Sequence, residues 1–121
     1  MTKLDHISIA VASADRSRDW YMQNLGLSVE FEVPTPRAVA LQDSDGFTLF
    51  ATEESFLPVA GNVALYFQVE SVVAAHDELT AKGVPIEHGP SKVFWGYGVQ
   101  LRDPDGYIVR LWDQASMKAN E

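Results

Sequence analysis

The sequence predicts an α+β fold of two tandem βαβββ modules, whose curled mixed sheets surround a concave cavity. The first supporting observation is a repeat: VALQDSDGF, residues 39–47, returns as VQLRDPDGY at residues 99–107, in a chain of 121 residues. The second is that strand-like and helix-like patterns follow the same order in both halves. A repeat at half of the chain length indicates one supersecondary unit used twice.

The repeated Asp-x-Asp-Gly segments are typical of hairpin turns. Asp43 and Asp103 can accept hydrogen bonds from the following backbone, and Gly46 and Gly106 close each turn without steric cost. Apolar residues alternate on both sides of each turn, which indicates antiparallel strands.

The first module is expected at about residues 4–54. Residues 4–11 alternate as a strand does, and Ser13 and Gly26 can begin and end the following helix. Three further strands are expected at residues 28–33, 37–42 and 46–53.

The second module is expected at about residues 63–114, after a linker at about residues 55–62. Its strand at 63–69 precedes a helix that Ser71 can cap and Gly83 can end. Further strands are expected at residues 84–88, 96–101 and 107–112. We interpret residues 1–121 as one domain, a size typical of single domains.

One helix covers only one face of a four-stranded sheet, so the opposite face must pack elsewhere or line a cavity. That face combines aromatic and polar residues: His6, Ser8, Thr48, Phe50, Tyr66, Gln68, Arg110 and Trp112. A sealed core rejects an unpaired arginine, whereas a partly wet concavity accepts it. The pattern therefore predicts an aromatic-lined pocket, although these rings could also fill the space by packing together.

Composition excludes several classes of protein. The net charge is −8, with nine Lys and Arg against 17 Asp and Glu, so no nucleic-acid partner is expected. The sequence has no cysteine, no apolar run of membrane length and no signal-peptide pattern. We therefore expect a cytoplasmic protein without a membrane partner.

The chain resembles the vicinal oxygen chelate superfamily, which includes glyoxalase I, extradiol dioxygenases and bleomycin-resistance binding proteins. The resemblance spans roughly residues 4–114. It depends on the paired βαβββ order and on three segments of the sequence, WYMQNLGL, FQVESVVAAHDELTAKGV and FWGYGVQLRDPDGYIVRLW. It implies a small-molecule ligand and a homodimer.

The resemblance also implies four metal-ligand positions, one on the first and one on the last strand of each module. They fall on His6, Phe50, Ala64 and Arg110, where metal enzymes of the family carry His or Glu. One imidazole does not hold a catalytic divalent ion, and a fixed positive charge repels it. We therefore expect no metal, no cofactor and no metal-dependent chemistry.

For several residues, two interpretations remain open. His6 could form a structural hydrogen bond or contact a ligand. Arg110 could pair with Glu30 or Glu32, or it could bind a ligand anion bidentately. Trp95 and Tyr97 lie beside glycines that would let the backbone approach a ligand, or Trp95 is packing under a rim. By strand alternation Asp5 should face away from His6, so no Asp–His pair is expected. His76 is expected at the core edge, and His88 is expected in a strand, at the surface or at a sheet edge.

Together these patterns favour a metal-independent binding protein that sequesters an antibiotic or aromatic metabolite, with no catalytic residue. The predicted ligand-binding residues are His6, Phe50, Tyr66, Trp95, Tyr97, Arg110 and Trp112. The alternatives are a lyase or isomerase that uses His6 as acid and base and Arg110 as an anion clamp, a dioxygenase-like metal enzyme, and an interaction module with a filled cavity.

Overall fold

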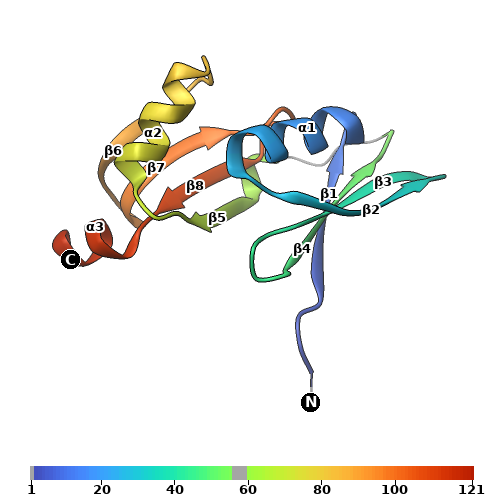
Figure 1. Ribbon diagram of the computed structural model, residues 1–121, viewed down its shortest axis with the longest axis horizontal. Helices are drawn as coiled ribbons and strands as arrows, with labels where there is room; N and C mark the ends of the chain where they lie inside the picture. Colours follow the sequence, from blue (N-terminus) through green and yellow to red (C-terminus); the bar gives the residue numbers. More distant parts are fainter. Residues whose placement is uncertain (1, 56–59) are drawn as a thin grey trace. The chain divides into compact units, whose positions relative to one another are not determined.

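The computed structural model describes residues 2–55 and 60–121 and divides into two compact units (Figure 1). Unit 1 comprises residues 1–59 and unit 2 comprises residues 60–121. Of the predicted linker at residues 55–62, residues 56–59 lie outside the described residues. Each unit is considered by itself below.

Unit 1 has the predicted βαβββ order. Its elements are β1 (His6–Val11), α1 (Ala14–Leu25), β2 (Ser28–Pro34), β3 (Arg37–Gln42) and β4 (Thr48–Glu53). The sheet order is β1-β4-β3-β2, with β1 parallel to β4 and the other neighbours antiparallel. Helix α1 contacts β3 and β4 and covers one face of this sheet.

Unit 2 repeats this order after a short 3-10 turn, η1 (Ala60–Asn62). Its elements are β5 (Ala64–Gln68), α2 (Val72–Ala81), β6 (His88–Val93), β7 (Gly96–Arg102), β8 (Ile108–Trp112) and α3 (Gln114–Ala119). The sheet order β5-β8-β7-β6 matches that of unit 1, again with one parallel pair, β5 and β8. The predicted α+β class and the paired modules are therefore confirmed.

Each unit has its core on the face that its helix covers. In unit 1 this core includes Ile9, Val11, Ala14, Tyr21, Val39, Leu41, Leu49 and Ala51. In unit 2 it includes Val72, Leu79, Val99, Leu101, Tyr107, Val109 and Leu111. Residues that alternate with these core positions face the opposite side of each sheet.

The repeated turns have the same hydrogen bonds in both units. The Oδ1 atom of Asp43 accepts from the backbone N–H groups of Asp45 and Phe47, at 2.9 and 3.0 Å. The Oδ1 atom of Asp103 accepts from those of Asp105 and Tyr107, both at 2.9 Å. Carboxylates that accept local backbone hydrogen bonds fix the turn geometry, so the repeat has a structural cause.

A carboxylate at the end of the last strand reaches the first residue of the helix in each unit. Glu53 accepts from the N–H of Ala14 at 3.0 Å, and Asp113 accepts from that of Val72 at 2.7 Å. Asp113, which is buried, also accepts from the N–H of Ser116 and so begins α3. Burial opposes the ionisation of Asp113, but these hydrogen bonds outweigh it and lower its pKa.

Two elements of unit 2 differ from the prediction. The edge strand β6 runs from His88 to Val93 rather than over residues 84–88, with a register shift after His88. Its sequence, HGPSKV, contains Gly and Pro, which disfavour strands, and the tertiary pairing with β7 overrides that preference. The short helix α3 was not predicted.

None of the helices in the described part of the chain has the length and apolar character that a membrane span requires.

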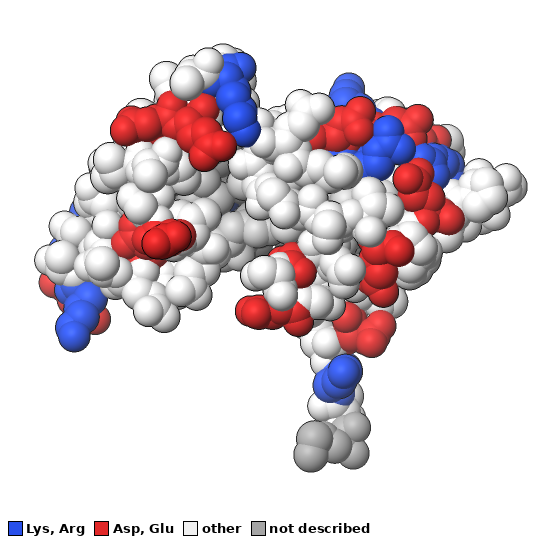
Figure 2. Space-filling model, in the orientation of Figure 1, with Lys and Arg blue, Asp and Glu red and all other residues white. Residues whose placement is uncertain are grey.

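Charged side chains lie at the surface of both units. Figure 2 shows several clusters of Asp and Glu on the visible face, in keeping with a net charge of −8.

Candidate ligand-binding site

Four polar residues lie side by side across the sheet of unit 2. The strand register pairs His88 with Gln100, Gln100 with Arg110, and Arg110 with Tyr66. Cross-strand partners share one face of a sheet, so these side chains form a row from β6 to β5. The row alternates with Leu101 and Val109, and therefore lies on the face opposite to the core that α2 covers.

Arg110 is the centre of this row. Its Nε–H donates to Oε1 of Gln100 at 2.8 Å, and one terminal nitrogen donates to the hydroxyl oxygen of Tyr66 at 2.5 Å. The residue is only 9% exposed. Within unit 2, no carboxylate of the described residues lies within 4.0 Å of the guanidinium, so this buried cation lacks an acidic partner in its own unit.

The predicted pairing of Arg110 with Glu30 or Glu32 would join the two units, and it stays a prediction. Glu30 accepts from the hydroxyl of Thr48 at 2.8 Å, and Glu32 forms ion pairs with Arg18 and Arg37. Both carboxylates are therefore bonded within unit 1.

Three aromatic rings surround the guanidinium of Arg110. Its central carbon lies 5.3 Å from the ring centroid of Tyr66, 5.1 Å from that of Phe94 and 5.5 Å from that of Trp95. Tyr66 and Trp95 also meet edge to face, with centroids 5.6 Å apart. The negative faces of such rings stabilise a cation, which helps to explain how Arg110 is tolerated without a carboxylate.

Trp95 folds back onto the sheet over Gly98. A Cβ atom at Gly98 would lie 2.5 Å from the indole ring and 2.1 Å from the carbonyl oxygen of Leu111. A Cβ at Gly96 would lie 2.4 Å from Sδ of Met117 in α3. The two glycines thus admit protein side chains, as in the alternative that Trp95 packs under a rim, whereas the approach of a ligand to them stays a prediction.

The indole nitrogen of Trp95 is a second feature of this site. Among the side-chain atoms that the structure describes, Nε1 of Trp95 is the buried polar atom without a hydrogen-bond partner. A buried N–H without an acceptor loses the hydrogen bond it makes with water, and a ligand atom can restore it.

Two further predicted residues lie on β7 and β8. Trp112 is half-buried and two positions from Arg110, so alternation places it on the same face. Alternation along β7 instead places Tyr97 with Val99, on the face that carries the core. The part of Tyr97 in ligand binding stays a prediction.

His6 and Phe50 lie together in unit 1. Their ring centroids are 4.8 Å apart, and Phe31 meets Phe50 edge to face at 5.5 Å. Nδ1 of His6 lies 2.9 Å from Oδ2 of Asp5, so the expectation that these neighbours face apart is wrong. The terminal position of His6 in β1 leaves Asp5 outside the strand pairing, free to turn its carboxylate towards the imidazole. This hydrogen bond lowers the pKa of Asp5.

The strand register supports the alignment of the four positions at which the resemblance implies metal ligands. Ser8 pairs with Phe50 as Tyr66 pairs with Arg110, and therefore His6 and Ala64 occupy equivalent places. Phe50 and Ala64 offer no donor atom, and Arg110 is a cation. These residues do not fit a divalent ion, and among the described residues no three His, Asp or Glu side chains are grouped to hold one.

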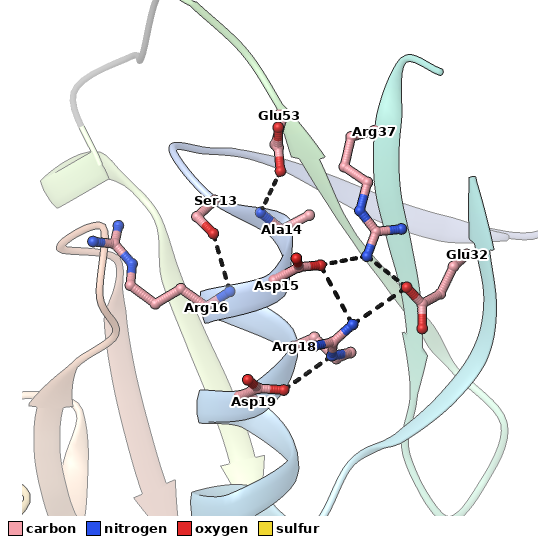
Figure 3. A network of polar contacts seen from close by, with 9 residues as sticks. All are labelled: Ser13, Ala14, Asp15, Arg16, Arg18, Asp19, Glu32, Arg37 and Glu53. Atoms are coloured by element: carbon pink, nitrogen blue, oxygen red, sulfur yellow. Dashed lines mark hydrogen bonds and ion pairs between the residues drawn. The ribbon is translucent and has the colours of Figure 1, made fainter. Parts of the chain in front are cut away.

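Two other polar features belong to unit 1. Figure 3 shows a network in which Arg37 bonds Asp15 and Glu32, and Arg18 bonds both of these and Asp19. These charges satisfy one another and join α1 to the β2–β3 hairpin. An open cavity of about 360 Å³ is lined by Lys3, Leu4, Asp5, Glu30, Asp45, Gly46, Phe47 and Thr48. Neither feature contains an unpaired buried group.

Sequence reasoning missed three residues of the site. Phe94 is 90% exposed beside Arg110, Gln100 accepts from its Nε–H, and His88 lies across the sheet from Gln100. His88 is half-buried in β6, with its ring centroid 6.1 Å from that of Trp95, and β6 is the edge strand that one of its two predicted places requires. Strand parity could have identified Gln100, whereas the other two depend on the position of β6 and its turn.

Comparison with solved structures shows the same fold. A possible glyoxalase from Bacillus cereus superposes with a TM-score of 0.77 at 19% identity, covering 92% of this chain and 98% of that one. A glyoxalase/dioxygenase from Nostoc punctiforme gives 0.75 at 23%, covering 93% and 90%. A fosfomycin resistance protein from Listeria monocytogenes gives 0.76 at 17%, covering 92% and 90%.

Comparison with curated protein sequences finds no match. A family model matches residues 3–111, and its description is the Glyoxalase/Bleomycin resistance protein/Dioxygenase superfamily. The match spans both units and the full row of residues around Arg110. The chain therefore belongs to the glyoxalase/bleomycin resistance protein/dioxygenase superfamily.

Proposed function

We propose that this protein binds a small molecule without a metal ion and holds it through an anionic group at Arg110. The observation that carries the proposal is the buried guanidinium of Arg110, which has no carboxylate within 4.0 Å among the described residues of unit 2. A buried charge without a counter-ion is costly, and a ligand anion would remove that cost. Arg110 also stands where the family's metal enzymes carry a ligand.

The biological role that fits this site is sequestration of an antibiotic or an aromatic metabolite. The family name includes bleomycin resistance, and one structural relative is a fosfomycin resistance protein. We further propose that the protein acts in the cytoplasm as a homodimer, as the resemblance implies. Sedimentation velocity would test the dimer: a single species of monomer mass at micromolar concentration contradicts it.

The test is ligand binding by the full chain after treatment with EDTA. A thermal-shift panel would contain bleomycin, fosfomycin, small aromatic acids and divalent metals. A ligand at ~100 times its Kd stabilises a protein by roughly 2.7 kcal/mol, a shift that is easily measured. Binding that appears only after a divalent ion is added would overturn the proposal, as would release of a chemically altered ligand.

A second candidate is a lyase or isomerase in which His6 acts as acid and base. The hydrogen bond between Asp5 and Nδ1 of His6 favours it, because a carboxylate at one ring nitrogen orients the other for proton transfer. Turnover of a small anionic substrate that His6→Ala abolishes and Asp5→Asn lowers would support this candidate. Turnover unchanged in both variants would exclude it.

A further inference from the structure

We propose that the ligand class for unit 2 is a flat aromatic monocarboxylate. Its carboxylate would be bound by Arg110, Trp95 and Tyr66, and its ring would lie against Phe94 and Tyr66. This inference rests on the proposed function and specifies the ligand of that same site.

The free polar groups of the site are hydrogen-bond donors. A guanidinium has five N–H groups, and those of Arg110 reach two acceptors, Gln100 and Tyr66, within the described parts of the chain. Nε1 of Trp95 has no acceptor at all there. The Tyr66 oxygen accepts from Arg110, which leaves its own hydroxyl proton for donation. Donors gathered around one cation match an oxyanion.

The charge of the site favours a monoanion. The row itself contains one guanidinium, that of Arg110. The Glu87 carboxylate accepts from Nε2 of Gln100 and from Nε of Arg102, both at 2.9 Å, so the charges of Glu87 and Arg102 offset each other. One negative charge balances Arg110. A second would be uncompensated in a protein whose net charge is already −8. A carboxylate therefore fits better than a phosphate dianion.

The rings beside Arg110 favour an aromatic body on the ligand. Phe94 is 90% exposed and Tyr66 is 50% exposed, although both lie within 5.3 Å of the guanidinium carbon. Exposed rings next to a buried cation present an apolar surface and a charge together. A ring attached to the bound carboxylate would cover that surface.

The experiment is isothermal titration of the full chain in EDTA with three probes of one shape: 2-naphthoate, 2-naphthamide and 2-naphthyl phosphate at pH 8. We expect 2-naphthoate to bind at least about tenfold more tightly than the neutral amide, because it adds charge-assisted hydrogen bonds. We expect it to bind more tightly than the phosphate, which is mainly a dianion at this pH.

Variants locate the binding. Arg110→Met should reduce the affinity for 2-naphthoate to that for the amide, and Arg110→Lys should lose several-fold because it lacks the planar fork. Trp95→Phe keeps a ring but removes Nε1, and should lose about threefold. Arg37→Met is the matched control: Arg37 pairs with Asp15 and Glu32 within unit 1, and affinity should stay unchanged. Circular dichroism of each variant separates lost binding from lost folding.

The outcomes separate this inference from the proposed function. Equal affinity for the amide and the carboxylate, tighter binding of the phosphate, or binding by none of the three overturns the aromatic monocarboxylate. Metal-free binding of another compound from the panel leaves the proposed function standing in each of these cases. A requirement for a divalent ion overturns both.

Discussion

The same row of four positions crosses the sheet of each unit, but its chemistry differs. In unit 1 the row is Ser8, Phe50, Ala40 and Phe31, and in unit 2 the equivalent row is Tyr66, Arg110, Gln100 and His88. The first row contains an aromatic pair and one hydroxyl, whereas the second is joined by hydrogen bonds around a buried cation. One backbone pattern therefore supports an apolar face and a polar face.

The features that the units share explain why this difference is tolerated. Turns, helix starts and strand-end carboxylates form hydrogen bonds on the core side or at the ends of the strands. They do not involve the uncovered face. Substitutions on that face can change binding without disturbing what specifies the fold, which is common in folds that host many functions.

The largest expected change in the free energy of unfolding comes from substituting Gly98, the glycine that distinguishes β7 from β3. Gly98 takes the place that Ala38 takes in unit 1, and a Cβ there would meet backbone at 2.1 Å. Gly98→Ala should lower the free energy of unfolding by about 3 kcal/mol, because strand β8 must shift. Ala38→Gly should cost about 1 kcal/mol, mainly through backbone entropy. Urea denaturation measures both, and equal losses would contradict the difference.

The next effect compares the two strand-end carboxylates. Asp113→Ala should cost about 2 kcal/mol, because it leaves the N–H groups of Val72 and Ser116 without their acceptor. Glu53→Ala should cost about 1 kcal/mol or less, since Glu53 reaches the single N–H of Ala14. Chemical denaturation of both variants provides the measurement, and the opposite order would show that the shared cap works differently in the two units.

The pH dependence of Asp113 sharpens that comparison. Its pKa is lowered in the folded protein from the ordinary value of 3.8, so the unfolded chain takes up a proton more readily. The stabilisation is therefore complete above about pH 5 and is lost as the pH falls through the lower, folded-state pKa. The stability gap between wild type and Asp113→Asn should close on acidification. A gap that widens below pH 4 would have the wrong sign.

Replacing Arg110 by the phenylalanine of the equivalent position in unit 1 should change stability less than the substitutions at Gly98 and Asp113. Arg110→Phe places a ring where unit 1 has Phe50, and it removes a buried charge without a carboxylate partner. We expect the free energy of unfolding to stay constant or rise by about 1 kcal/mol, because the desolvation cost of the cation disappears. Thermal denaturation without ligand tests this, and a loss of several kcal/mol would show that Arg110 serves mainly to hold the sheet together.

The smallest effect belongs to the surface network of unit 1. Arg37→Gln removes the ion pairs with Asp15 and Glu32, which are largely solvent-exposed. Exposed pairs contribute little and are screened by salt, so the loss should be smaller than the losses at Gly98, Asp113 and Glu53 and should vanish at about 1 M NaCl. Denaturation at low and high salt provides the comparison. A loss that persists at high salt would indicate packing by the arginine stem.

Most of the fold was predictable because the interactions that define each repeated unit form between residues close together in the sequence. The turn aspartates, the serine caps and the alternating strands are encoded within a few residues of one another, and they correctly gave two βαβββ units. The predicted position of strand β6 was wrong because the segment contains Gly and Pro, which disfavour strands. Pairing with β7 nevertheless holds this segment as a strand. Helix α3 is too short for a periodic signal.

The candidate site was predictable only in part. Alternation correctly places Tyr66 and Arg110 on one face, and their contact confirms it. The indole of Trp95 over Gly98 could not be derived, because it depends on the path of the β6–β7 turn. The Asp5–His6 hydrogen bond was missed because alternation does not apply outside a paired strand.

The indole of Trp95 gives this protein an intrinsic optical reporter. Of its three tryptophans, Trp95 lies within contact distance of Arg110 and Tyr66, Trp112 lies two positions from Arg110 in β8, and Trp20 lies in α1 of the other unit. Emission from an indole N–H that gains an acceptor moves to longer wavelength. A fluorescence spectrum of the unlabelled chain would therefore register occupation of the row beside Arg110, and subtraction of the Trp95→Phe spectrum would isolate that signal.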